Sequence, residues 1–220
     1  MKWDILSLIP ALAAEAEALG VKIRTNCRVE PDRIAPGAYD LVVLATGQEP
    51  FFPCLWENDG SLRETTAVAL LNGESWCGER VALIGGGMVG CECAEFLSEY
   101  GKKVTLFEMK EGLAQDAYWN IRDQLLQRMK KYEVRAVTGA AATAVRKRSI
   151  VCMENEAERS YGPFDTMVSA VGLREAATME GRLRERGIRC VVIRQKEGAS
   201  GIQRTLTAAV ETMLALENEK

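Results

Sequence analysis

Hydrophobic positions along this chain fall into short continuous runs and into longer stretches with helical spacing. The run YDLVVLATG (39–47) is apolar without alternation and rich in Val and Leu, and VALI (81–84) and VTLF (104–107) are similar short runs. Such runs are typical of strands in a parallel sheet that is buried on both faces. The pattern therefore predicts an α/β protein built on parallel strands.

The run at 39–47 returns later in the chain as FDTMVSAVG (164–172). An aromatic residue, an aspartate, a valine, an alanine and a final glycine recur at the same spacing in both copies. The matched positions are Tyr39, Asp40, Val43, Ala45 and Gly47 in the first copy, and Phe164, Asp165, Val168, Ala170 and Gly172 in the second. One architectural unit is therefore used twice.

Stretches with helical spacing alternate with these runs, and glycines mark several of their ends. Gly20 follows the first predicted helix, which contains Pro10 as a local irregularity, and Gly101 follows the third. The predicted helices are at 3–19, 65–72, 88–100, 117–131 and 203–217, and the predicted strands are at 21–24, 41–45, 81–84, 104–107, 164–172 and 190–193. Strand-like material is expected near 133–153, followed by a polar turn at 154–160.

The segment VALIGGGMVGCECAEFLSEYGKKVTLFE (81–108) carries the clearest chemistry. Gly85, Gly87 and Gly90 form G-x-G-x-x-G between a strand and a helix, and a second strand follows. Gly85 permits a tight turn, Gly87 lets backbone approach a pyrophosphate, and Gly90 allows close packing of helix on strand. Backbone N–H groups at the helix start would then face the anion. The alternative is a glycine loop that serves packing alone.

Glu108 ends the second strand, 18 residues beyond Gly90. A carboxylate at this place can accept hydrogen bonds from the adenosine ribose, and it would repel the extra phosphate of NADPH, although Lys110 could offset that repulsion. The alternative for Glu108 is a solvated carboxylate at a strand end. The candidate cofactor-binding residues of this unit are Gly85, Gly86, Gly87, Met88, Val89, Gly90, Glu108 and Met109.

Composition limits the classes of function. The formal charge of −3 and the short, scattered basic clusters argue against a nucleic-acid-binding surface. No apolar run approaches the ~20 residues of a membrane span, and the N-terminus lacks a secretory pattern, so we expect a cytoplasmic location and no membrane partner.

The chain has 7 cysteines, no C-x-x-C pair and no histidine. Zinc sites and Ser-His or Cys-His nucleophiles are therefore not expected, and we assign neither a catalytic side chain nor a metal ligand. Cys91 and Cys93, two positions apart on a helix, point to different sides and are expected to pack as free thiols. Any redox chemistry here is expected to be that of a cofactor.

Four segments give the chain a family resemblance: YDLVVLATGQEP (39–50), VALIGGGMVGCECAEFLSEYGKKVTLFEM (81–109), FDTMVSAVGLREA (164–176) and IQRTLTAAVETMLAL (202–216). The chain resembles the C-terminal part of the NADH:flavin oxidoreductases fused to an old-yellow-enzyme barrel, the group that includes 2,4-dienoyl-CoA reductase and trimethylamine dehydrogenase. These proteins share a fold like that of the pyridine nucleotide-disulfide oxidoreductases.

The resemblance implies a Rossmann-like NAD(P)-binding domain inserted in a second, incomplete Rossmann-like domain of the FAD type. The NAD(P)H domain would cover 79–172, the partial FAD-type domain 1–50 and 173–220, and a connection 51–78. It also implies that Val171 and Gly172 lie near the nicotinamide. NAD(H) is the implied cofactor, with NADP(H) as a second possibility and FAD as the family's flavin.

Two departures from the family count against a flavin site formed by this chain alone. No glycine fingerprint precedes 39–47, so we expect the first part of that domain to be missing here. Arg194 and Gln195 also stand where the family has a Gly-Asp pair whose aspartate holds the ribityl chain. The expected partners are a dinucleotide and either the missing flavin-domain and barrel region or a second copy of the chain.

Three functions remain open at this point. The first is the NAD(H)-binding part of a flavin-dependent oxidoreductase, whose family role is hydride transfer from NAD(P)H to flavin. The second is an S-adenosylmethionine-dependent methyltransferase, which shares a glycine loop and an acidic strand end but lacks the paired ATG-type strands. The third is a non-catalytic dinucleotide-binding or structural module without flavin.

Overall fold

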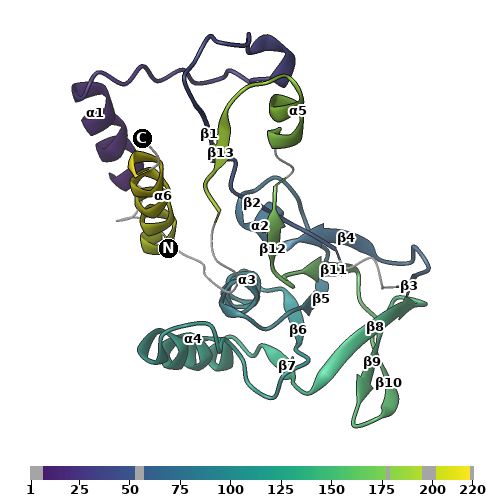
Figure 1. The fold of residues 1–220 in the computed structure, drawn as a ribbon. Coiled ribbons are helices and arrows are strands. Elements are labelled where there is room, and N and C mark those ends of the chain that lie inside the picture. Colours follow the sequence, from purple (N-terminus) through teal and green to yellow (C-terminus); the bar gives the residue numbers. More distant parts are fainter. Residues whose placement is uncertain (1–6, 53–56, 177–178, 195–201, 219–220) are drawn as a thin grey trace. The chain divides into compact units, whose positions relative to one another are not determined.

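The computed structural model describes residues 7–52, 57–176, 179–194 and 202–218 (Figure 1). The chain divides into two compact units. The first unit combines residues 1–45 with 177–220, and the second comprises residues 46–176, so that the second is inserted into the first along the sequence.

Within the described part of 46–176, the central element is a five-stranded sheet in which all pairs are parallel. Its strands are β4 (Arg63–Thr66), β5 (Arg80–Ile84), β6 (Lys103–Phe107), β7 (Arg135–Val137) and β11 (Thr166–Ser169), in the order β4-β11-β5-β6-β7. The continuous apolar runs predicted buried strands, and β5 and β11 are buried almost throughout. The glycine-loop strand β5 therefore lies at the centre of the sheet.

Helices cover one face of this sheet (Figure 1). They are α3 (Met88–Glu99) and α4 (Trp119–Lys131), close to the predicted 88–100 and 117–131, and the short α2 (Ala67–Leu71). Leu83 of β5 and Leu106 of β6 pack with Cys91 and Leu97 of α3 and Leu125 of α4. This apolar layer holds the start of α3 against the end of β5.

A second, four-stranded sheet covers the other face, again counting described residues only. Its strands are β3 (Glu57–Asn58), β8 (Ala140–Arg146), β9 (Ser149–Glu154) and β10 (Ala157–Tyr161), in the order β10-β9-β8-β3. The two hairpins turn through Lys147-Arg148 and Asn155-Glu156, all with positive φ, as tight two-residue turns require. The predicted polar turn at 154–160 is therefore wrong in extent, because β10 pairs with β9 within it.

The segment predicted to be a connection, 51–78, also contributes regular structure. β4 pairs with β11 at the sheet edge, and the predicted helix at 65–72 begins only at Ala67, where the Thr66 hydroxyl accepts a hydrogen bond from Ala69 N–H. The strand was missed because RETT has no hydrophobic periodicity. Likewise β2 (Gln48–Pro50) pairs antiparallel with β12 (Leu173–Glu175), so the residues that follow the two repeated motifs form one ribbon.

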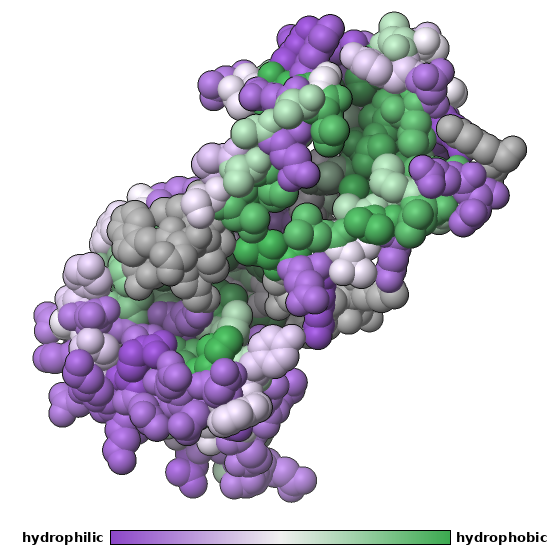
Figure 2. Space-filling view, turned by 90° about the vertical axis from the view of Figure 1, so that its left-hand side faces the viewer, coloured by the Kyte–Doolittle hydropathy of each residue, from purple (hydrophilic) through white to green (hydrophobic). Residues whose placement is uncertain are grey.

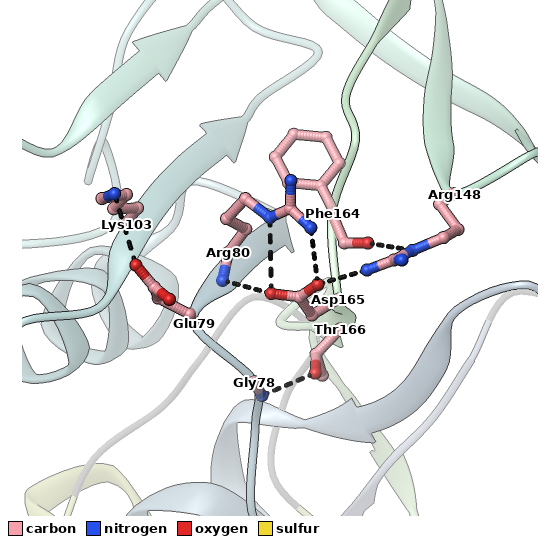
Figure 3. Close-up of polar contacts among 8 residues, drawn as sticks. All are labelled: Gly78, Glu79, Arg80, Lys103, Arg148, Phe164, Asp165 and Thr166. Atoms are coloured by element: carbon pink, nitrogen blue, oxygen red, sulfur yellow. Dashed lines mark hydrogen bonds and ion pairs between the residues drawn. The ribbon is translucent and has the colours of Figure 1, made fainter.

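A polar cluster joins the N-terminal ends of β5 and β11 (Figure 3). The Asp165 carboxylate accepts hydrogen bonds from the backbone N–H of Arg80 (2.8 Å) and from its guanidinium (3.0 Å), and it also pairs with Arg148. Gly78 N–H donates to the Thr166 hydroxyl (3.0 Å). The second motif's aspartate thus fixes β11 beside β5 at the edge opposite the glycine loop.

The other unit contains helices and two short strands among its described residues. They are α1 (Leu8–Ala18), the 3-10 helix η2 (Pro31–Arg33), β1 (Val42–Leu44), α5 (Glu180–Glu185), β13 (Cys190–Val192) and α6 (Ile202–Glu217). β1 and β13 pair in parallel, and Leu44, Val192, Leu183 and Ile188 form a small core. Residues 3–6 of the first predicted helix lie outside the described residues.

The predicted strand at 21–24 is wrong, because these residues form no strand and Val21 and Ile23 are exposed. A strand needs a partner, and no described strand pairs with this segment. α1 and α6 contain no buried residue among those described. Figure 2 shows hydrophobic residues gathered on the surface over this unit, whereas the part around α4 is largely hydrophilic.

Candidate dinucleotide-binding site

The structure brings the predicted site residues together at one edge of the five-stranded sheet. In the strand register Ile84 of β5 lies opposite Phe107 of β6 and Ser169 of β11. The glycine loop, Glu108 and Val171 follow directly after these three strand ends. The carboxyl ends of the strands in an open α/β sheet are where ligands usually bind.

Two of the glycines are required by close packing. A Cβ on Gly85 would lie 2.5 Å from the carbonyl oxygen of Ala170, and φ at Gly85 is +105°. A Cβ on Gly90 would lie 1.9 Å from the carbonyl oxygen of Gly85. Gly90 thus allows α3 to contact the loop, and Gly85 allows the loop to contact the end of β11. Close packing alone therefore requires glycine at both positions.

Gly87 is different, because a Cβ there would meet no atom closer than 3.4 Å. It is the N-cap of α3, whose first N–H groups point out of the helix end. The positive end of the helix dipole adds to their attraction for an anion. A glycine that packing does not demand, next to these N–H groups, fits the close approach of a pyrophosphate.

Glu108 is buried, with 9% of its surface exposed, so the alternative of a solvated carboxylate is wrong. One carboxylate oxygen accepts a hydrogen bond from Gly86 N–H (2.6 Å), and the other accepts one from Lys110 N–H (2.9 Å). Each oxygen has a second lone pair that a ribose hydroxyl can use. Glu108 therefore ties the strand end to the glycine loop.

The segment after Glu108 also contacts the glycine loop, which the sequence did not predict. Ala114 N–H donates to the Gly86 carbonyl (2.7 Å), and the Leu113 side chain lies against Gly86. Met88 N–H, at the start of α3, donates to the Asp116 carboxylate (2.8 Å). We call residues 109–117 the covering segment. Its sequence has neither helical nor strand periodicity, so no local signal indicated these contacts.

The remaining candidates lie at the rim of the site. Met109 and Val89 are exposed, Val171 is half-buried, and Gly172 is exposed with φ of +123°. Such positions leave their side chains or backbone accessible to a bound molecule.

The cysteines near the loop are unsuited to redox chemistry. Cys91 and Cys93 are fully buried free thiols, in agreement with the packing role expected for them. Burial raises the pKa of each thiol to about 12, so both stay protonated at neutral pH. Cys91 donates a weak hydrogen bond to the Gly86 carbonyl (3.3 Å) and so helps to hold the loop.

The parallel sheet, the glycine loop and the helix that starts at Gly87 define a Rossmann-like nucleotide-binding domain. The sequence pattern of the pyridine nucleotide-disulphide oxidoreductase family matches residues 21–195, and the chain belongs to this family.

Two curated relatives are 32% identical to the chain. One is an NADH oxidase of Thermoanaerobacter brockii, aligned over 171 residues that make up 73% of this chain and 25% of the relative. The other is a bilirubin reductase of Mediterraneibacter gnavus, aligned over 177 residues, 80% of this chain and 27% of the relative. The chain thus spans about a quarter of these relatives.

Solved structures show the same fold. A 2-naphthoyl-CoA reductase superimposes with a TM-score of 0.79 at 20% identity, over 93% of this chain and 31% of its own. A histamine dehydrogenase from Rhizobium sp. 4-9 superimposes with a TM-score of 0.74 at 14% identity, over 90% of this chain and 35% of its own. Among the described residues, no helix has the length and apolar character of a membrane span.

Proposed function

We propose that residues 46–176 bind NAD(H) at the carboxyl ends of β5 and β6, as the pyridine-nucleotide-binding part of a flavin-dependent oxidoreductase. The observation that carries the proposal is that a Cβ on Gly87, at the start of α3, would meet no backbone atom among its three nearest neighbours and only the exposed Asp116 side chain, at 3.4 Å or more. In this arrangement the loop binds the pyrophosphate, Glu108 accepts hydrogen bonds from the adenosine ribose, and backbone at Val171 and Gly172 lies near the nicotinamide. NADP(H) is the less favoured ligand.

NADH supplies a hydride when it is bound, and the family resemblance implies that a flavin would accept it. The residues of this chain would position the nicotinamide and provide its electrostatic environment, because in hydride transfer between cofactors the reacting atoms belong to the cofactors. The barrel and the rest of the flavin domain found in the resembling family would supply the flavin site. The buried free thiols suit a reducing compartment, which favours a cytoplasmic location.

Calorimetric titration of the purified chain with NADH tests the nucleotide site. We expect binding to the unmodified chain and none to Gly87→Leu, because a leucine side chain would fill the pyrophosphate position. Gly181→Leu is the matched control: it makes the same change at an exposed glycine of α5, where φ is not positive and a Cβ would meet no atom within 4 Å, and it should leave NADH affinity unchanged. Unchanged affinity in Gly87→Leu would contradict the assignment.

One observation favours the alternative of a binding module without its own flavin. Arg194 stands where the family has the ribityl-binding pair, and its guanidinium bonds the Glu180 carboxylate (2.6 Å). Gln195 lies outside the described residues. A cation tied to Glu180 cannot accept a ribityl hydroxyl as an aspartate does.

An absorption spectrum separates the two functions. We expect the chain, purified alone, to show no flavin band and no NADH oxidation, while still binding NADH. Stoichiometric bound FAD would contradict this expectation and favour an enzyme complete within the chain.

A further inference from the structure

We infer that the Asp116 carboxylate occupies the phosphate position of the glycine loop and lowers the affinity for dinucleotide until it is displaced. This inference rests on the proposed function, because it concerns the same site. It makes Asp116 an affinity-determining residue that the G-x-G-x-x-G pattern does not contain.

Two contacts define the position of Asp116. Its Oδ1 accepts a hydrogen bond from Met88 N–H (2.8 Å), the first residue of α3. Its Oδ2, Oδ1 and Cγ are the three atoms nearest to an ideal Cβ on Gly87, at 3.4 to 3.7 Å. The carboxylate therefore lies over Gly87 at ordinary contact distance, and no backbone atom is among the three nearest to the ideal Cβ.

The chemistry of this contact matches that of a bound phosphate. A carboxylate at a helix N-terminus accepts from a free N–H group and gains from the helix dipole, as a phosphate oxygen would. Two anions cannot share the position without repulsion. A pyrophosphate that approaches Met88 N–H must therefore displace Asp116 or bind beside its charge.

Asp116 can leave more easily than the other residues that contact the loop. Glu108 and Ala114 are buried, whereas Asp116 is exposed. Glu108 and Ala114 hold Gly86, so the loop keeps its shape when Asp116 turns away. The carboxylate thus satisfies the helix end in the free protein and competes with the ligand for it.

The test is Asp116→Asn, titrated with NADH, with ADP and with adenosine. Helix-terminal charges are worth roughly 0.3 to 1 kcal/mol, so we expect NADH and ADP to bind about twofold to fivefold more tightly than to the unmodified chain. Adenosine, which has no phosphate, should bind equally to both. The gain should shrink in high salt, because the repulsion is screened. Asp116→Ala, which removes the competing acceptor as well, should bind NADH at least as tightly as Asp116→Asn.

Asp123→Asn is the matched control, because it removes the same charge from an exposed position on α4, where the Asp123 carboxylate accepts a hydrogen bond from the Gln127 side chain (3.0 Å). Its NADH affinity should equal that of the unmodified chain. Loss of the contact with Met88 N–H should lower the melting temperature of Asp116→Ala, whereas Asp116→Asn keeps an acceptor there. A residue with only that structural role would change stability without tightening NADH.

The outcomes separate this inference from the proposed function. If the unmodified chain binds NADH and Asp116→Asn binds it equally or more weakly, the inference is overturned and the proposed function stands. If neither variant nor the unmodified chain binds NADH or ADP, both are overturned. Equal tightening of adenosine would also overturn the inference, because the effect would then not come from the phosphates.

Discussion

Asp165 and Arg80, separated by 85 positions, are joined both through the arginine guanidinium and through its backbone N–H (Figure 3). These hydrogen bonds lower the pKa of Asp165 from its ordinary value of 3.8 to about 2, and those from the Arg80 side chain have the largest effect. The aspartate of the second repeated motif therefore helps to set the position of β11 beside the glycine-loop strand.

This pKa predicts an acid-dependent part of the stability. A carboxyl group with a lower pKa in the folded state stabilises the fold above its unfolded pKa, and the contribution is lost as pH falls through the folded value. We therefore expect Asp165→Asn to unfold more easily at pH 7, by about 1 to 2 kcal/mol, because charged hydrogen bonds are worth roughly 1.5 to 3 kcal/mol and partial exposure reduces this. The difference from the unmodified chain should fade between pH 4 and pH 2.

Urea unfolding at several pH values measures this effect. Glu79→Gln is the control, because Glu79 pairs with Lys103 in an exposed position and its loss should change stability by less than about 0.5 kcal/mol. A constant difference for Asp165→Asn from pH 7 to pH 2 would show that the titration of Asp165 does not contribute.

The glycine loop predicts two different responses to added methyl groups. Gly90→Ala would place Cβ 1.9 Å from the Gly85 carbonyl, so we expect a loss of about 1 to 3 kcal/mol from overpacking. Gly87→Ala meets only ordinary contacts and should unfold like the unmodified chain. Thermal unfolding of the two variants compares them directly, and equal melting temperatures would contradict the role of Gly90 in packing.

Glu108 predicts a preference between the two nicotinamide cofactors. The 2′-phosphate of NADPH would face this buried carboxylate, and loss of a charged hydrogen bond implies roughly tenfold weaker binding than for NADH. Glu108→Gln should bring the ratio of the two dissociation constants toward one. Glu111→Gln changes an exposed carboxylate of the covering segment and should keep the ratio. Equal affinities in the unmodified chain would show that Glu108 does not read the ribose.

The second hairpin predicts a stabilising substitution. Glu156 adopts φ of +66° in a two-residue turn, where glycine is unstrained and other residues pay roughly 1 to 2 kcal/mol. Glu156→Gly should raise the free energy of unfolding by about 0.5 to 1 kcal/mol. This is less than the strain that it relieves, because glycine loses more chain entropy on folding. The same change at Glu158, within β10, should lower it. Destabilisation by Glu156→Gly would show that the turn tolerates glutamate without strain.

We expect the chain to self-associate through the unit formed by residues 1–45 and 177–220. Residues 21–24 form no strand that could cover β1, and β1 pairs with β13 alone among the described strands. A free strand edge and exposed apolar residues on α6, among them Leu206, Val210 and Leu214, favour association. We expect a solution mass of about twice 24.2 kDa by light scattering.

Leu206→Glu with Val210→Glu should shift that mass toward the monomer, because charges on an apolar contact resist burial. Trp119→Glu is the control: it changes a residue that is 84% exposed on α4 and should leave the mass unchanged. A monomeric mass for the unmodified chain would contradict the prediction.

The sequence by itself determined the parallel α/β class, the strand–glycine loop–helix unit and the set of residues at the sheet edge. These features depend on local patterns: unbroken apolar runs bury both faces of a strand, and glycine spacing reflects contacts within one continuous unit. That is why 81–109 folds as predicted, with Gly85 in a turn at φ of +105° and Gly90 in close packing at the start of the helix.

Only the tertiary structure decided which segments pair and which loop side chains reach the site. β4 and β10 are strands because β11 and β9 offer them free edges, whereas Val21 to Arg24, with ordinary strand composition, has no described partner. The hydrogen bond between Glu108 and Gly86 joins residues 22 positions apart, and the one between Asp116 and Met88 joins residues 28 positions apart. No local pattern encodes such contacts, because they depend on how a non-periodic segment packs over the finished loop.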